Sequence, residues 1–232
     1  MQISTAFFPD NSLDWRFFLP ITPEIKILIV GHECENIYQH FLRLGIASVY
    51  YCTDNMQLPV VDSGTGKDQQ SRMTFAELEL RSDLLSFFDV VVFPHGLVQM
   101  EFSNSKVRQP PEFHFVKKFM RSGGVLLVSF ANGLFFKQKK LQSGYYYSYV
   151  WKMKSMLKKN GYDLTSIYGA IPDQFVPEYI FPLTIHSIGF ILRSRYKDKI
   201  PSLLLPCLTN SVLTKIIANF FPAYFIVATA SF

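Results

Sequence analysis

The side chains most suited to chemistry follow apolar runs of the sequence. His95 comes after Phe88-Asp-Val-Val-Val-Phe93 and Pro94, and an imidazole that titrates near neutral pH is a candidate general base. The alternative is that His95 is an ordinary loop residue at the end of a strand. Asp54 likewise follows the run Tyr51-Cys-Thr53, where its carboxylate either binds a ligand or caps the turn that begins with Asp-Asn.

Two other motifs resemble known ligand sites, but each lacks residues that such a site requires. His32 and Glu33 are adjacent, but no third ligand follows at a usable spacing, so the sequence predicts no metal site. Gly64-Thr-Gly-Lys67 resembles a P-loop, yet Val61 and Asp68 replace the required glycine and hydroxyl residue. The dinucleotide fingerprint G-x-G-x-x-G is also absent after the first apolar run.

A dense basic segment lies between Ala131 and Tyr162, and it contains no acidic residue. Aromatic residues are interleaved with its lysines, as in proteins that track a nucleic-acid backbone or lie on anionic lipid head groups. The plainer interpretation is a solvated helix face with core aromatics. The lysines are Lys137, Lys139, Lys140, Lys152, Lys154, Lys158 and Lys159; a second basic cluster comprises Arg193, Arg195, Lys197 and Lys199.

The composition is that of a folded chain with a divided charge. The 232 residues are 49% hydrophobic and 18% charged, which excludes a disordered protein and a charged coiled coil. Residues 1–116 carry 8 Lys and Arg against 14 Asp and Glu, whereas residues 117–232 carry 15 against 4. An acidic first half is therefore joined to a basic second half.

Cysteine usage and the two ends of the chain predict a cytoplasmic protein. Cys34, Cys52 and Cys207 form no CxxC pair, which favours reduced thiols over a zinc ribbon or a disulfide framework. The N-terminus lacks the basic start and long apolar run of a signal peptide. Prolines and polar residues interrupt the apolar tail 200–232, which favours a buried helix and a strand over a spanning helix.

The order of elements predicts a doubly wound α/β domain. A buried strand over 24–31, a helix over 35–44 and a strand over 47–54 form a βαβ unit, which is right-handed and parallel. Strands and helices continue to alternate to the end of the chain. The further strands are expected near 73–78, 88–93, 123–130, 163–170 and 223–229, the helices over 113–120, 146–160, 183–196 and 208–219, and a loop over 57–70.

Several of these segments together resemble the class I S-adenosylmethionine-dependent methyltransferases, over roughly residues 15–230. The resemblance implies a single Rossmann-like domain with a seven-stranded, mostly parallel sheet whose last strand is antiparallel beside the sixth. It also implies a lead-in (1–22), a cofactor-side half (23–116) and an acceptor-side half (117–232). The segments that carry it are Asp14–Pro20, Lys26–Gly31, Tyr51–Asp54, Phe87–His95, Phe119–Val128, Gly161-Tyr162, Tyr168–Pro172 and Tyr179–Leu183.

The resemblance assigns roles to individual positions. Gly31, His32 and Glu33 would adjoin the methionine part of S-adenosylmethionine, and Asp54 would accept hydrogen bonds from its ribose. Phe93 would also contact the cofactor, and His95 would be the catalytic base. The basic segment would lie beside the substrate entrance, so the implied acceptor is a small or carrier-linked, anionic molecule methylated on oxygen or nitrogen.

Two departures from the family pattern leave other functions open. The loop after the first strand has one glycine where two or three are expected, with Glu33 near the second position, and Ile29 replaces the usual acidic residue. A degenerate methyltransferase-like protein that acts as a binding partner or accessory subunit is therefore the alternative. A weaker alternative is an accessory protein that binds nucleic acid or a membrane surface through Lys137–Lys159.

Overall fold

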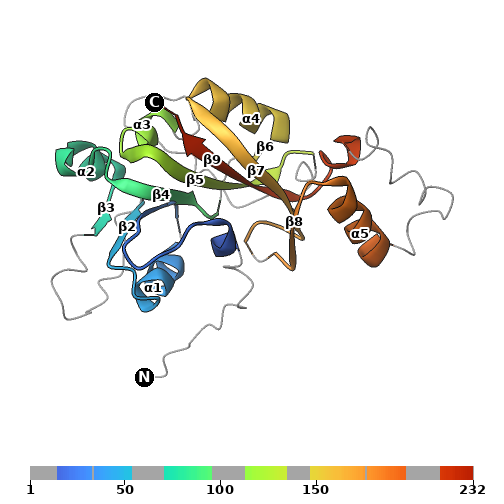
Figure 1. Ribbon diagram of the computed structural model, residues 1–232, viewed down its shortest axis with the longest axis horizontal. Coiled ribbons are helices and arrows are strands. Elements are labelled where there is room, and N and C mark those ends of the chain that lie inside the picture. Colours follow the sequence, from blue (N-terminus) through green and yellow to red (C-terminus); the bar gives the residue numbers. More distant parts are fainter. Residues whose placement is uncertain are drawn as a thin grey trace.

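The computed structural model describes residues 15–32, 34–53, 71–95, 113–134, 147–175, 177–196 and 215–231. Strands and helices alternate along these ranges (Figure 1). In chain order the elements are β1 (Lys26–Val30), α1 (Glu35–Arg43), β2 (Ser48–Cys52), β3 (Arg72–Met73), α2 (Phe75–Leu80), a 3-10 turn (Ser82–Leu84), β4 (Phe88–Phe93), α3 (Phe113–Lys117), β5 (Met120–Asn132), β6 (Tyr147–Ser148), α4 (Val150–Lys159), β7 (Tyr162–Ile171), β8 (Tyr179–Pro182), α5 (Ile185–Tyr196) and β9 (Ala223–Ala230).

All of these strands belong to one sheet, in the order β3-β2-β1-β4-β5-β9-β7-β8, with β6 beside the end of β5. Strands β3, β2, β1, β4 and β5 are parallel, and β9 runs antiparallel between β5 and β7. The chain places β2 and β3 on one side of β1 and then returns to place β4 on the other side. The predicted parallel sheet with an antiparallel last strand is confirmed, although the described residues form nine strands and not seven.

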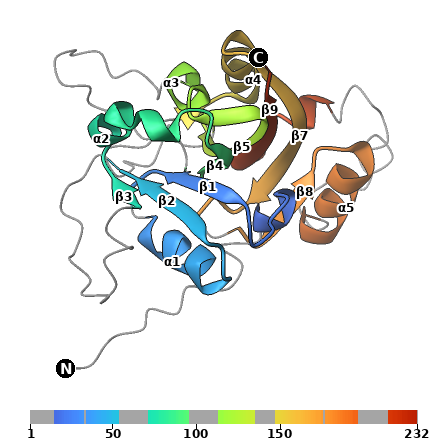
Figure 2. The ribbon, with the colours of Figure 1, turned by 60° about the vertical axis from the view of Figure 1, so that its left-hand side comes forward.

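The central strands form because their apolar runs are buried on both faces. In β1, Leu28 faces one hydrophobic cluster and Ile29 the other, and both side chains are fully buried. Helices α2, α3 and α4 cover the first face, whereas α1 and residues 15–19 cover the second (Figures 1 and 2). Phe18 stacks on Tyr168 with ring centroids 3.8 Å apart, which ties the start of the described chain to β7.

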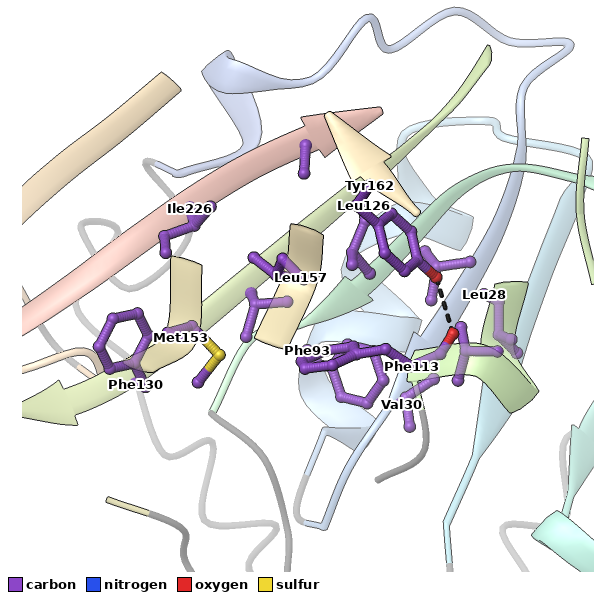
Figure 3. Close-up of a cluster of buried hydrophobic side chains, with 14 of the residues drawn as sticks. Leu28, Val30, Phe93, Phe113, Leu126, Phe130, Met153, Leu157, Tyr162 and Ile226 are labelled. Atoms are coloured by element: carbon purple, nitrogen blue, oxygen red, sulfur yellow. Dashed lines mark hydrogen bonds between the residues drawn. The ribbon is translucent and has the colours of Figure 1, made fainter. Parts of the chain in front are cut away.

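The larger cluster joins helices to strands from both halves of the chain. Figure 3 shows Met153 and Leu157 of α4 among side chains from β1, β4, β5 and β9. Tyr162, at the start of β7, donates a hydrogen bond to the Phe113 carbonyl over 2.9 Å. Burial raises the pKa of Tyr162, so its hydroxyl remains a donor. Gly161, between the end of α4 and Tyr162, has φ +74°, a conformation that glycine adopts at helix C-termini.

The predicted strand near 73–78 is wrong, because a helix occupies most of it. Thr74 accepts a hydrogen bond from the Glu77 amide, and the Glu77 carboxylate accepts one from the Thr74 amide. This capping box stabilises the first turn of α2, which leaves β3 with two residues. Strand β8 was not predicted; it forms a hairpin with β7 at the edge of the sheet, where Pro182 is tolerated.

Other predicted boundaries shift by a few residues. The helix expected over 113–120 ends at Lys117, so that β5 begins at Met120, and the helix expected over 146–160 begins at Val150. The loop over 57–70 lies outside the described residues, as does most of the helix expected over 208–219, of which 215–217 are helical. None of the helices in the described ranges combines the length and apolar character needed to cross a bilayer.

Candidate functional site

The carboxyl ends of β1, β2 and β4 form the centre of the candidate site. Val30 pairs with Cys52, and Ile29 pairs with Val92, so Gly31, Thr53 and Pro94 follow at the same edge of the sheet. Open α/β sheets bind ligands at this edge, where the chain reverses its strand order. Of the other predicted residues, Glu33 and Asp54 lie outside the described residues.

Gly31 makes the tight turn from β1 into α1. Its φ of +145° is disfavoured for residues with a side chain, and an added Cβ would lie 3.1 Å from the Cys34 sulfur. Its amide donates a hydrogen bond to the Cys52 carbonyl over 3.0 Å. Helix α1 begins directly after this turn, so its first-turn amides point toward the same edge of the sheet. Its N-cap residue, Cys34, makes no side-chain cap hydrogen bond.

A set of hydrogen bonds holds this turn against the end of β2. The Cys34 amide donates to the Tyr51 hydroxyl over 3.3 Å, and Tyr51 also bonds with Thr53. Thr53 Oγ1 lies 3.4 Å from His32 Nδ1. Burial, followed by the nearby Cys34, raises the pKa of Tyr51 to about 12, so the phenol remains neutral. This contact holds half-buried His32 against the end of β2.

An ion pair at the first turn of α1 was not predicted from the sequence. Arg72 Nη2 of β3 donates to Glu35 Oε1 over 2.5 Å, and the guanidinium lies 5.2 Å from the centre of the Tyr38 ring. Gln39 Nε2 donates to the same carboxylate oxygen over 2.9 Å. Within the described part of the chain, buried Glu35 Oε2 and Arg72 Nε have no hydrogen-bond partner. The pair therefore retains one acceptor and one donor.

Two predicted positions lie in the core. Ile29 is fully buried in the cluster that includes Cys34 and Tyr51, so no carboxylate comes from this position. The Phe93 side chain is also fully buried, with its ring centroid 6.2 Å from that of Phe113. The Phe93 ring therefore belongs to the core and not to a ligand site.

His95 lies past β4, on the side of the site toward β5 and β7. Its ring centroid is 5.3 Å from that of Phe175, and among the described residues its buried Nδ1 has no hydrogen-bond partner. Burial lowers the pKa of His95 to about 4, so the imidazole is neutral at pH 7. A neutral imidazole accepts a hydrogen bond, although such a low pKa makes it a weak base.

Three polar residues that were not predicted from the sequence lie near the ends of β5 and β7. Gln174 is 3% exposed, and its Oε1 has no partner among the residues that the structure describes. Ser129 Oγ donates to the Pro94 carbonyl over 2.6 Å, which fixes the turn before His95. At the end of β5, Asn132 Nδ2 donates to the carbonyls of Asn219 and Phe221, each over 2.8 Å. Gln174 comes four residues after the end of the predicted strand 163–170 and has no specific signal in the sequence.

The basic segment is divided between described and undescribed residues. Lys137, Lys139 and Lys140 lie outside the described ranges. On α4, Lys152, Lys158 and Lys159 are exposed, whereas Lys154 is half-buried. The Tyr149 and Trp151 rings stack at 4.6 Å, and Trp151 is 54% exposed. In the second basic cluster, Arg193 is exposed. The Arg195 side chain, Lys197 and Lys199 lie outside the described part of the chain.

Metal ligands do not gather at this edge in the described ranges. No group of three or more His, Cys, Asp or Glu side chains that could hold a metal ion occurs there. The buried Cys34 and Cys52 form no disulfide in the described ranges, and Cys34 Sγ donates to the His32 carbonyl over 3.1 Å. Both thiols therefore serve packing and the turn.

Comparison with known proteins gives similar structures and no similar sequence. The sequence matches no protein-family model and no functionally curated protein. A methyltransferase of Archaeoglobus fulgidus, described as dependent on S-adenosylmethionine, is similar with a TM-score of 0.55 and 12% identity, over 94% of this chain and 92% of that one. It is therefore similar along almost its whole length.

Two further structures contain bound molecules. A Haemonchus contortus phosphoethanolamine N-methyltransferase, solved with phosphomonomethylethanolamine and S-adenosylhomocysteine, has a TM-score of 0.53 and 13% identity. The similarity covers 96% of this chain but 53% of that enzyme, so the chain spans about half its length. A Streptomyces coelicolor geranyl diphosphate C-methyltransferase, solved with Mg2+, geranyl diphosphate and S-adenosylhomocysteine, has a TM-score of 0.50 and 11% identity over 90% of this chain and 73% of that one. The chain thus has the fold of the class I S-adenosylmethionine-dependent methyltransferases.

Proposed function

We propose that this protein transfers a methyl group from S-adenosylmethionine to oxygen or nitrogen of a small or carrier-linked, anionic acceptor. The observation that carries the proposal is the strand order, with β9 inserted antiparallel between β5 and β7. Similar structures with this fold were solved with S-adenosylhomocysteine. Because one fold hosts several functions, the site residues must supply the rest of the argument.

The residues at the end of β1 fit the amino-acid part of the methyl donor. Gly31 leaves the backbone of the turn open to a close approach. The uncapped first turn of α1 suits a carboxylate, because helix N-termini attract negative charge. Glu35 Oε2, which has no described partner, suits an ammonium group. These groups would hold the donor, whose sulfonium supplies an electrophilic methyl group when it is bound.

His95 and Gln174 would orient the acceptor. Neutral His95 can accept a hydrogen bond from an acceptor hydroxyl or amine, and its pKa of about 4 disfavours full proton removal at pH 7. Gln174 Oε1, also without a partner in the described ranges, offers a second acceptor atom. Positioning of a nucleophile against an electrophile is itself a large part of catalysis.

An anionic acceptor is supported by charge. The second half of the chain has a net charge of +11, and the exposed lysines of α4 follow β6, which pairs with the end of β5. Two of the similar structures bind phosphate-bearing molecules, phosphomonomethylethanolamine and geranyl diphosphate. A basic surface raises the local concentration of such substrates.

Calorimetry with S-adenosylmethionine and S-adenosylhomocysteine tests the donor site. We expect both to bind, and Glu35→Gln to weaken binding at least tenfold because the ammonium loses a charged partner. Glu79→Gln, an exposed change on α2, serves as the control and should leave the affinity unchanged. Absence of heat and of a thermal shift at millimolar ligand would contradict the proposal.

A degenerate, non-catalytic binding protein is the second candidate. Buried Ile29 at the position of the usual acidic residue and the low pKa of His95 favour it. Donor binding by the Glu33→Gly variant, which restores a glycine of the family loop, distinguishes the two candidate functions. If the native chain binds the donor tightly and the change weakens binding, the degenerate interpretation fails; donor binding that appears only in the variant supports it.

A further inference from the structure

A cavity lies away from the β1–α1 turn, near the edge of the sheet that β7 and β8 form. Its volume is about 730 Å³, which is within the range of small-molecule sites. It is bounded by α4, the middle of β7, the turn from β8 into α5, and residues 215–219. Strands β4, β5 and β9 separate β7 from β1 (Figures 1 and 2), so this cavity is distinct from the proposed donor site.

The walls of the cavity combine an apolar part with positive charge. Val150, Ile167 and Leu183 belong to, or pack against, the larger hydrophobic cluster. Among the described residues of the lining, Lys154 and Lys215 are charged and none is Asp or Glu. Ser166, Tyr168, Thr184 and Asn219 also contribute atoms to the lining.

Lys154 is in an unusual position for a lysine. It is half-buried on α4, and it makes no ion pair with any acidic residue in the described ranges. Burial, followed by the nearby Lys158, lowers the pKa of Lys154. A lysine held in this way is stabilised by an anion that enters the cavity, because the anion restores the interactions that burial removed.

The wall at Lys215 is tied to the sheet. Asn219 Nδ2 donates to the Lys215 carbonyl over 2.9 Å, and the Asn219 carbonyl in turn accepts from Asn132 at the end of β5. The segment that carries Lys215 is therefore anchored to a central strand. The two lysines thus lie on separate, fixed walls of one cavity.

We infer that this cavity binds a small organic anion, in which a phosphate or carboxylate group pairs with Lys154 and Lys215 and an apolar body packs against Val150, Ile167 and Leu183. The inference does not depend on methyl transfer, because none of the lining residues belongs to the proposed donor site. Charge-assisted hydrogen bonds from the two ammonium groups would supply much of the affinity, and burial of the apolar body would supply the remainder.

Calorimetry with four simple probes tests the inference in the absence of any methyl donor. Octyl phosphate and octanoate carry both an anionic group and an apolar body, whereas 1-octanol lacks the charge and inorganic phosphate lacks the body. We expect the first two to bind with at least tenfold higher affinity than the last two. Equal affinity for octyl phosphate and 1-octanol would overturn the charge argument, and equal affinity for inorganic phosphate would overturn the apolar one.

Three substitutions locate the site. Lys154→Met and Lys215→Met each remove one ammonium and keep most of the side-chain volume, so each should weaken octyl phosphate binding at least tenfold. Lys159→Met, an exposed change on the same helix outside the lining, should change the affinity less than twofold. Lys215 is exposed, so its variant remains informative even if Lys154→Met affects folding. Equal weakening by all three changes would overturn the site and indicate nonspecific attraction.

The same measurements separate this inference from the proposed function. Octyl phosphate binding that persists when S-adenosylhomocysteine does not bind supports the cavity and contradicts only the methyl-transfer proposal. Binding of S-adenosylhomocysteine without any binding of octyl phosphate or octanoate overturns the cavity alone.

Discussion

At the scale of single residues, the candidate site contains four buried polar atoms that have no hydrogen-bond partner among the described residues. They are Glu35 Oε2, Arg72 Nε, His95 Nδ1 and Gln174 Oε1. Leaving such atoms unpaired costs about 1–3 kcal/mol each, so a ligand that pairs with them gains affinity. They lie on two sides of the carboxyl edge: Glu35 and Arg72 beside β3, and His95 and Gln174 beyond β4 and β7. This division matches a site for two reactants.

His95 should make the stability of the protein depend on pH. Its pKa is about 4 in the folded chain because of burial, against about 6.5 when unfolded. Between these values the unfolded chain binds more protons, so stability is complete above pH 6.5 and is lost as the pH falls toward 4. When the pH falls from 7.5 to 4.5, the native protein should lose about 2 kcal/mol more unfolding free energy than the His95→Gln variant does. This figure allows for the partial exposure of His95.

Urea unfolding at the two pH values measures this difference. His114→Gln, an exposed change on α3, is the control and should retain the pH dependence of the native protein. A His95→Gln variant that loses as much stability as the native chain would show that His95 titrates normally.

At the scale of elements, the sequence predicts best where burial determines the structure. β1 and β4 are apolar apart from Lys26 and Asp89, and all of their other residues are buried, which is the pattern of a strand in the middle of a parallel sheet. β8 could not be predicted from the sequence, because it is short and ends at Pro182. The Glu35–Arg72 pair could not be predicted for a different reason. It depends on the position of β3 beside β2, and its partners are 37 positions apart in the sequence.

Helix α2 shows a local signal that outweighs apparent strand character. The run Met73-Thr-Phe-Ala-Glu-Leu78 is mostly apolar, yet Thr74 and Glu77 have the spacing of a capping box. Thr74→Ala should lower the unfolding free energy by about 1 kcal/mol, because the Glu77 amide loses its acceptor. Denaturant titration measures the change.

Two comparison variants make that prediction specific. Glu77→Gln retains an acceptor for the Thr74 amide and should cost less than Thr74→Ala. Thr22→Ala, at an exposed position before β1, should change stability by less than about 0.5 kcal/mol. Equal losses in Thr22→Ala and Thr74→Ala would contradict a role for the cap.

At the scale of the whole molecule, the acidic and basic halves of the chain share one sheet. β4 of the first half pairs with β5 of the second, and the last strand, β9, lies between β5 and β7. Leu28 of β1 and Ile226 of β9 belong to the same buried cluster (Figure 3). A cluster that spans both halves predicts that they unfold together.

Two core substitutions and one reporter test this prediction. Trp151→Phe replaces an exposed tryptophan and leaves buried Trp15, which packs near α1, as the single fluorescent reporter. In this background Leu28→Ala and Ile226→Ala should each lower the unfolding free energy by about 2–5 kcal/mol. Trp15 fluorescence and far-UV circular dichroism should give one coincident transition in every variant. Ile216→Ala, at an exposed position, should leave that transition in place. If Ile226→Ala shifts the dichroism transition but not that of Trp15, the two halves unfold separately, and the sheet would not be one cooperative unit.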